Sequence, residues 1–263
     1  MPPPRPTAAA AAPALAAAAA IGPYFAWEAW SPAASWRPFT DLLTPSVARD
    51  RVAVARSTLV GAFGLSSDDV PARVVASIYF MGVASRLLSP PYGAAVAGGA
   101  LPQPSRANLW WRPVAAGPVP IAYGAVPAVS TAGAAPAEIA SMLVTVPLAE
   151  TVTPLLELFR AEFRLSPKVL WGNVASALAG AAGVLADTMP RHAARAGAVL
   201  DHALALPPLA GSGTVVRPAA DPRRFLVRAN CCLYYRIPGG GTCADCVLTS
   251  DADRREQWAA LLG

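Results

Sequence analysis

All 4 cysteines of this 263-residue chain lie between positions 231 and 246. They have the spacing C-C-x10-C-x2-C and are Cys231, Cys232, Cys243 and Cys246. Cysteines that only fill a hydrophobic core would be scattered along the sequence. A single metal site explains their concentration, and such a site also fixes how this part of the chain folds, because its ligands must meet at one place.

The residues between the two cysteine pairs allow the site to close. Cys243 and Cys246 form a C-x-x-C hook, whose two thiolates can chelate one ion. The stretch 238–241, with the sequence PGGG, can reverse the chain through positive-φ conformations. This reversal brings the hook back to Cys231 and Cys232, so we expect all four sulfur atoms to converge.

The spacing leaves the kind of metal site open. Adjacent cysteines in an extended chain point to opposite sides, which disfavours a single tetrahedral zinc ion. A 2Fe-2S cluster has two irons and accepts diverging sulfurs, either as the pairs 231–232 and 243–246 or in a crossed arrangement. The iron-sulfur interpretation is favoured, while zinc and a disulfide pair remain as alternatives.

Upstream of the cysteines, the sequence indicates a helical body. Apolar residues recur at helical spacing from Leu148 to Phe163. Ser166 followed by Pro167 is typical of a helix start, and that helix should reach Thr188 before Pro190. A third helix is expected to end near Leu204.

The first half of the chain has weaker signals. A helix is predicted from Val70 to Leu88, and we expect it to stop at Ser89, Pro90 and Pro91. The prolines that follow favour short edge strands at residues 109–114 and 121–125. Residues 1–20 are rich in Ala and Pro, and we expect them to be frayed. The predicted fold class is α+β and predominantly helical, with a small antiparallel sheet and a C-terminal cysteine-rich lobe.

Composition excludes several classes of protein. Hydrophobic residues make up 54% of the chain, which rules out disorder. The net charge of +5 comes without a clustered basic patch, so no nucleic-acid partner is expected. Residues 169–186 carry no charge but contain Asn173 and Ser176, and they are interpreted as a buried helix and not as a membrane span. Pro13 interrupts the Ala-rich start, so an export signal is not expected and a cytoplasmic protein is predicted.

The segment CCLYYRIPGGGTCADCVL resembles the C-terminal cluster-binding motif of the ferric siderophore reductase family, of the ferric-hydroxamate and ferrioxamine reductase type. Three upstream segments extend the resemblance in the expected order: IGPYFAWEAW, RVVASIYFMGVASRLLSP and LWGNVASAL. The residues just before the cysteine pair, Ala229 and Asn230, depart from the more basic sequence typical of the family. This departure bears on tuning of the cluster and not on its presence.

The resemblance implies a 2Fe-2S cluster on Cys231, Cys232, Cys243 and Cys246, and one-electron reduction of siderophore-bound Fe3+. It divides the chain into residues 1–20, a siderophore reductase body at 21–218 and a 2Fe-2S segment at 219–263. The implied partners are a ferric hydroxamate siderophore and an electron donor such as a ferredoxin or a reductase. The implied location is the cytoplasm, including the inner face of the membrane. The competing hypothesis is a non-catalytic zinc-binding interaction protein that uses the same cysteines.

Two sets of side chains are candidates for supporting roles. Arg228 and Arg236 flank the cysteines, and a cation near a cluster favours its reduced, more negative form. Arg86, Trp171 and Asn173 are candidate siderophore contacts, because ferric hydroxamates offer apolar linkers and oxygen acceptors. The Trp110 and Trp111 pair is a further candidate of this kind.

Overall fold

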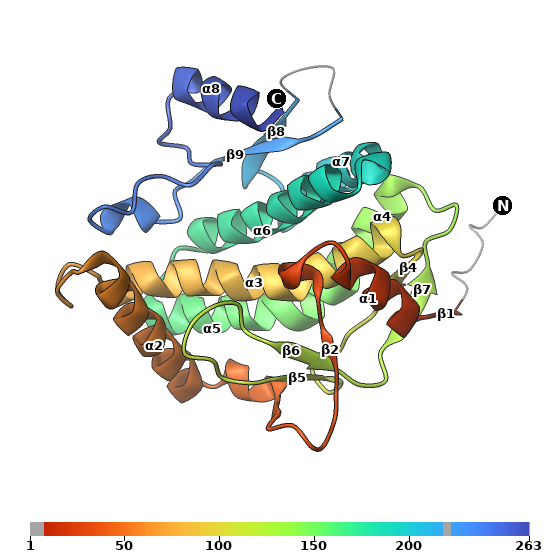
Figure 1. The fold of residues 1–263 in the computed structure, drawn as a ribbon, viewed down its shortest axis with the longest axis horizontal. Coiled ribbons are helices and arrows are strands. Elements are labelled where there is room, and N and C mark those ends of the chain that lie inside the picture. Colours follow the sequence, from red (N-terminus) through yellow and green to blue (C-terminus); the bar gives the residue numbers. More distant parts are fainter. Residues whose placement is uncertain (1–7, 218–221, 263) are drawn as a thin grey trace.

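The computed structural model describes residues 8–217 and 222–262 (Figure 1). Its α-helices are α1 (Ala11–Ala19), α2 (Pro45–Phe63), α3 (Ala72–Ala97), α4 (Pro136–Leu143), α5 (Thr153–Phe163), α6 (Pro167–Thr188), α7 (Ala193–Ala205) and α8 (Asp251–Leu262). Short helical turns are η1 (Pro23–Phe25), η2 (Phe39–Leu43), η4 (Pro190–His192) and η5 (Tyr234–Arg236), and η3 (Val144–Val152) is a π-helix. The strands are β1 (Ala8–Ala10), β2 (Glu28–Ala29), β3 (Arg37–Pro38), β4 (Ala100–Pro102), β5 (Leu109–Trp111), β6 (Ile121–Tyr123), β7 (Pro127–Ser130), β8 (Gly213–Val216) and β9 (Phe225–Arg228).

Helices α3 and α6 pack side by side and form the centre of the body (Figure 1). Helices α1, α2 and α5 pack against α3, while α7 packs against α6 and α4. Leu87 and Leu88 of α3 and Leu178 of α6 are fully buried. Burial of such apolar side chains is the main stabilising contribution to a domain of this kind.

The predicted helices of the second half are confirmed. Helix α6 begins at Pro167, and the Ser166 hydroxyl caps it by accepting a hydrogen bond from the Lys168 N–H at 3.3 Å. The apolar pattern from Leu148 to Phe163 lies on η3 and α5, which continue α4 without a break. The expected third helix is α7.

The predicted stop of the first long helix at Pro90 and Pro91 is wrong, because α3 continues through both prolines to Ala97. Pro90 has no N–H for the carbonyl of Arg86, four residues earlier. That carbonyl instead accepts a hydrogen bond from the indole nitrogen of Trp27, at 2.8 Å. The side chain of a distant residue therefore satisfies the group that the proline leaves without a helical partner.

The expectation of a frayed start is also wrong for residues 8–20, which form β1 and α1; residues 1–7 lie outside the described part. Ala14, Leu15 and Ala18 of α1 are buried against the body. A side chain at Gly98 would stand only 2.7 Å from the Ala14 carbonyl oxygen. The absence of this side chain lets the alanine-rich helix approach α3 closely, so its small residues pack well.

In the described part of the chain, the strands form three small sheets. Strands β1, β7 and β4 form an antiparallel sheet, and β8 pairs with β9. The predicted strands at 109–114 and 121–125 exist as β5 and β6, but they are the inner strands of the order β2-β6-β5-β3 and not edges. This sheet is mixed, because β2 runs parallel to β6. Two-residue strands, which the sequence pattern did not reveal, cover both edges.

Among the residues that the structure describes, three helical segments are long and apolar enough to cross a membrane, judged by length and composition: Ala72–Ala97, Pro136–Phe163 and Pro167–Thr188. The sequence had indicated only the last of them as a candidate. Their most apolar windows are 61%, 50% and 72% buried inside the protein. Their apolar surfaces are thus used largely for packing within the fold.

The C-terminal lobe lies on the α6 side of the body (Figure 1). Strand β9 packs against α6, and Trp258 of α8 packs on Phe225 of β9 with ring centroids 5.0 Å apart. The chain is therefore an α+β protein that is mainly helical, as predicted. The predicted domain boundary between residues 218 and 219 lies outside the described residues.

Candidate metal centre

The four cysteines lie in the loop that joins β9 to α8. This loop contacts the body through the backbone of Cys232, whose carbonyl accepts a hydrogen bond from the Ser77 hydroxyl of α3 at 2.8 Å. A second contact joins the Ser176 hydroxyl of α6 to the Asp245 carboxylate. The two central helices thus hold the two cysteine-bearing segments of the loop.

Local backbone conformation positions each cysteine. Leu233 has a φ of 75°, a left-handed conformation that turns the chain directly after the cysteine pair. Gly239 and Gly241 have φ of 78° and 70°, which confirms the predicted reversal between the two pairs. The hook itself is a turn, in which the Cys246 N–H donates to the Cys243 carbonyl at 3.0 Å.

Backbone N–H groups point at several of the sulfur atoms. The N–H of Leu233 donates to Cys231 Sγ at 3.3 Å, and that of Leu248 donates to Cys246 Sγ at 3.4 Å. The N–H of Tyr234 makes the same kind of contact with Cys232. Such donors stabilise thiolates, the form in which cysteine binds a metal.

The sulfur atoms meet in two pairs. Cys232 Sγ and Cys243 Sγ are 3.7 Å apart, and the thiols of Cys231 and Cys246 also interact. In the described ranges 8–217 and 222–262, no three His, Cys, Asp or Glu side chains surround a position for one ion. Each pair therefore takes one cysteine from each half of the motif, which matches the crossed arrangement that the spacing had left open. Two pairs suit two irons better than one tetrahedral zinc.

Thiol acidity differs within the pairs. The pKa of Cys232 is lowered to about 6, chiefly by a hydrogen bond from the Cys243 thiol, and the Arg228 charge acts in the same direction. The pKa of Cys243 is raised well above its usual value, because its proton is held between the two sulfurs. Burial raises the pKa of Cys231 to about 11.

Arg228 provides a test of whether these residues fit a negatively charged group. Its side chain is 1% exposed, and within the described residues no carboxylate pairs with it. Its Nε has no hydrogen-bond partner. A buried cation without a carboxylate partner is costly, and a neighbouring 2Fe-2S cluster, which is a dianion when oxidised, would balance it. The arrangement therefore fits a cluster on the four cysteines.

Asn173 connects this arginine to the body. Its side-chain oxygen accepts from Arg228 Nη2, and its nitrogen donates to the carbonyl and the hydroxyl of Ser77 at 2.9 Å and 3.0 Å. Ser77 in turn donates to Cys232. Asn173 lies far from the cysteines in sequence, but these hydrogen bonds connect it to them in space. The Asn173 side chain is fully buried and belongs to a chain of hydrogen bonds that ends at the carbonyl of Cys232.

The other candidate substrate residues lie elsewhere. The Arg86 guanidinium is buried and donates to the backbone carbonyls of Val119, Pro23 and Ala26. Trp171 is partly buried against the core. Trp110 stacks on Trp30 with centroids 5.0 Å apart, and Trp111 is fully buried. A role of these residues in siderophore binding stays a prediction.

Arg236 differs from Arg228 in its surroundings. It is exposed on η5, where its guanidinium lies 5.8 Å from the Tyr235 ring centroid. The hydrogen bond with Tyr235 raises its pKa further, with a small contribution from Cys231. Its role in tuning a cluster stays a prediction, as does that of Arg228.

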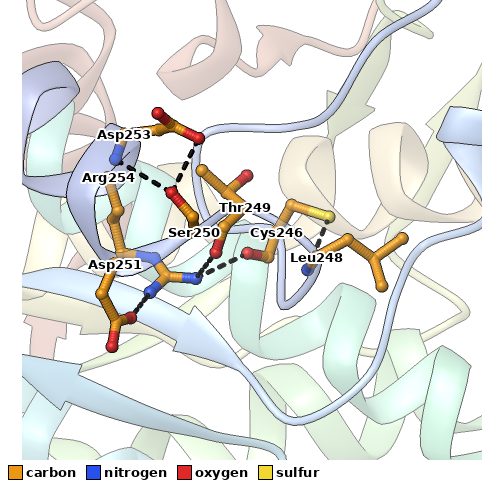
Figure 2. A network of polar contacts seen from close by, with 7 residues as sticks. All are labelled: Cys246, Leu248, Thr249, Ser250, Asp251, Asp253 and Arg254. Carbon is orange, nitrogen blue, oxygen red and sulfur yellow. Dashed lines mark hydrogen bonds and ion pairs between the residues drawn. The ribbon is translucent and has the colours of Figure 1, made fainter.

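Helix α8 holds the second cysteine segment through Arg254 (Figure 2). Arg254 Nη2 donates to the carbonyls of Cys246 at 3.0 Å and Thr249 at 2.7 Å, while Nη1 pairs with Asp251. Sequence reasoning missed Arg254 and Ser77. An arginine in the helix just after a cysteine hook is a signal that could have pointed to Arg254. No local signal identifies Ser77.

Comparison with known proteins agrees with this geometry. Residues 228–248 match the family model described as the FhuF 2Fe-2S C-terminal domain. No curated protein matches the chain. The matched segment begins at Arg228 and contains all four cysteines, so the expected resemblance to FhuF-type ferric siderophore reductases is confirmed through this motif. The expected cofactor, a 2Fe-2S cluster, is confirmed with it.

Proposed function

We propose that this protein is a ferric siderophore reductase that transfers one electron to siderophore-bound Fe3+ and so releases iron in the cytoplasm. The observation that carries the proposal is the pairing of the four cysteines in a 2Fe-2S domain at the protein surface. Cys231 and Cys243 are partly exposed, whereas Cys232 and Cys246 are buried. Each pair thus has one side that a reaction partner can approach.

The chemistry requires little beyond electron delivery. Hydroxamate oxygens are hard ligands that bind Fe3+ far more tightly than Fe2+. Each turnover reduces one Fe3+ to Fe2+ and oxidises the electron donor by one electron, with no covalent bond broken in the siderophore. When bound, a 2Fe-2S cluster supplies electrons one at a time.

The chain's own residues hold and charge-balance the site. Backbone N–H groups and the buried Arg228 guanidinium offset negative charge around the sulfurs. Ser77 and Arg254 fix the backbone of Cys232 and Cys246. No general acid, base or nucleophile is needed for this reaction.

The electron donor is proposed to be an acidic ferredoxin or a reductase. A net charge of +5 favours encounter with a negatively charged protein. A cytoplasmic location, including the inner face of the membrane, supplies such donors together with imported chelates. The body, residues 21–218, is proposed to bind the chelate.

A steady-state assay tests the proposal. Electrons are supplied anaerobically through NADPH, a ferredoxin reductase and a ferredoxin, and released Fe2+ is trapped by a chromogenic chelator. We expect the cluster-loaded protein to accelerate Fe2+ release from a ferric trihydroxamate, and the Cys232→Ser/Cys243→Ser double variant to give only the background rate. Equal rates with and without loaded protein, across ferric hydroxamates, would refute the proposal.

A further inference from the structure

Two neighbouring cavities lie along α6. A cavity of about 280 Å³ is lined by Ala244 and Asp245, the residues between Cys243 and Cys246. A cavity of about 310 Å³ is lined by Tyr24 and Phe25 of η1. Both cavities are lined by Gly180 and Val184 of α6, so they adjoin at these two residues, and together they are called the groove.

The groove extends from the residues of the cysteine hook to those of η1 on the body. Its floor is α6, which lies beneath β9 and α8 (Figure 1). Val184, near the C-terminal end of α6, is an aliphatic residue that is 44% exposed. A groove with an exposed apolar floor and a redox centre at one end is suited to a bound molecule that must be close to that centre.

The charged groups at this end of the groove are already paired. Arg223 forms an ion pair with Asp187, and Arg224 pairs with Asp201 at 3.0 Å. Asp245 accepts a hydrogen bond from Ser176. The walls thus offer no surplus of positive charge. They match a ligand without net charge, such as Fe3+ bound by three singly charged hydroxamates, better than a highly anionic tris-catecholate.

We propose that this groove is the chelate-binding site, with the chelated metal near Ala244 and Asp245 and the apolar linkers along Gly180 and Val184. The assignment rests on the proposed function. It places the chelate on the outer surface of α6 and not at Arg86 or Asn173, whose polar groups are engaged inside the protein.

Gly180 offers a clean test of the site. A Cβ added at this position meets no atom within 4 Å, so a larger side chain enters the groove without a clash. Gly180→Leu also improves helix propensity, so the fold is expected to persist. Gly61 of α2 is the matched control, because a Cβ there also meets nothing within 4 Å and Gly61 lines none of the three described cavities.

The experiment measures binding of a Ga3+ trihydroxamate, which has the shape and charge of the ferric complex but is not reduced. Calorimetric titration of the cluster-loaded protein is expected to show binding by the wild type and by Gly61→Leu. Gly180→Leu should bind about tenfold more weakly or worse, since its side chain occupies the groove. Visible absorbance and thermal melting of each variant verify the cluster and the fold.

The outcomes separate the groove from the reductase function. Unchanged affinity in Gly180→Leu, or no binding by the wild type, would overturn the groove as the chelate site even if reduction is observed. Equal affinity for the Ga3+ tris-catecholate would contradict the charge argument that selects the ligand. Groove-dependent binding of the Ga3+ complex without reduction of the ferric complex would instead refute the proposed function and leave the binding site standing.

Discussion

The helical body and the cysteine loop are held together by different forces. In the body, α3 and α6 meet through fully buried leucines. In residues 229–250, the buried side chains are Cys232, Ile237, Cys246 and Thr249, and two of these are proposed cluster ligands. The body is therefore stabilised by apolar burial, whereas the loop depends on its cluster and on a few polar contacts with the body.

The largest effect is expected from loss of a ligand. Cys232→Ser should abolish stable loading of the cluster, because oxygen ligands suit iron-sulfur clusters poorly. Iron content and visible absorbance measure the loss. Since the loop contributes little apolar burial, far-UV circular dichroism of the body should remain close to that of the wild type.

A variant that lost the helical signal together with the cluster would show that the body depends on the metal. The two regions would then form one cooperative unit, contrary to this account. A variant that kept a full and stable chromophore would instead remove Cys232 from the ligand set.

A substitution in the core of the body should instead destabilise the fold. Leu178→Ala removes a fully buried side chain from α6 and is expected to lower the free energy of unfolding by about 2–5 kcal/mol. Leu248→Ala, in the cysteine loop, removes a side chain that is 55% exposed and should change it by roughly 0.5 kcal/mol or less. Denaturant unfolding monitored by circular dichroism measures the free energy of unfolding of both variants. Equal losses in the two would contradict the proposed difference between the body and the cysteine loop.

The same difference explains what could be predicted from sequence. The Ser166–Pro167 helix start, the apolar pattern of α5 and the clustered cysteines are local signals. Both helices formed as predicted, and the cysteine sulfurs lie close together as the spacing indicated. The stop at Pro90 was wrong because its remedy, the Trp27 indole, lies 59 residues away. The pairing of cysteines could not be chosen, since it depends on the path of the chain in space.

The contacts around the site were also hidden from sequence reasoning. Arg228 was a candidate because it is next to the cysteines, but its link to Asn173 spans 55 residues. The alanine-rich α1 was underestimated, because its fit depends on close approach at Gly98 and not on large side chains. Polar contacts between residues far apart in the chain, and close packing of small residues, leave no periodic pattern in the sequence, so neither could be predicted from it.

Substitution of either arginine beside the cysteines is expected to have a smaller effect, which is a shift of the cluster's reduction potential. Reduction adds negative charge, so removing the buried cation in Arg228→Gln should lower the cluster's reduction potential, on the order of 50–100 mV. Arg228→Lys should recover much of the loss. The charge of the exposed Arg236 is screened by solvent, so Arg236→Gln should shift the reduction potential by a smaller amount. Spectroelectrochemical titration gives the values, and equal shifts for the two glutamine variants would remove burial as the cause.

The smallest effect is expected from substitution of Arg254, which anchors the cysteine loop to α8. Arg254→Ala removes the donors to the Cys246 and Thr249 carbonyls and should loosen the second cysteine segment (Figure 2). Loss of the cluster to an iron chelator is expected to become about three- to tenfold faster. Arg255→Ala, on the exposed side of the same helix, is the control. Identical bleaching rates in the two variants would show that the anchor does not support the site.

The central claim, that this chain delivers single electrons to a ferric chelate, is tested most directly by one anaerobic single-turnover measurement. Protein with a photoreduced cluster, freed of excess reductant, is mixed with a ferric trihydroxamate in the presence of an Fe2+ trap. The account predicts that the visible absorbance of the oxidised cluster returns while about one Fe2+ is trapped per cluster. A cluster that stays reduced in the presence of excess chelate, with no Fe2+ trapped, would contradict it.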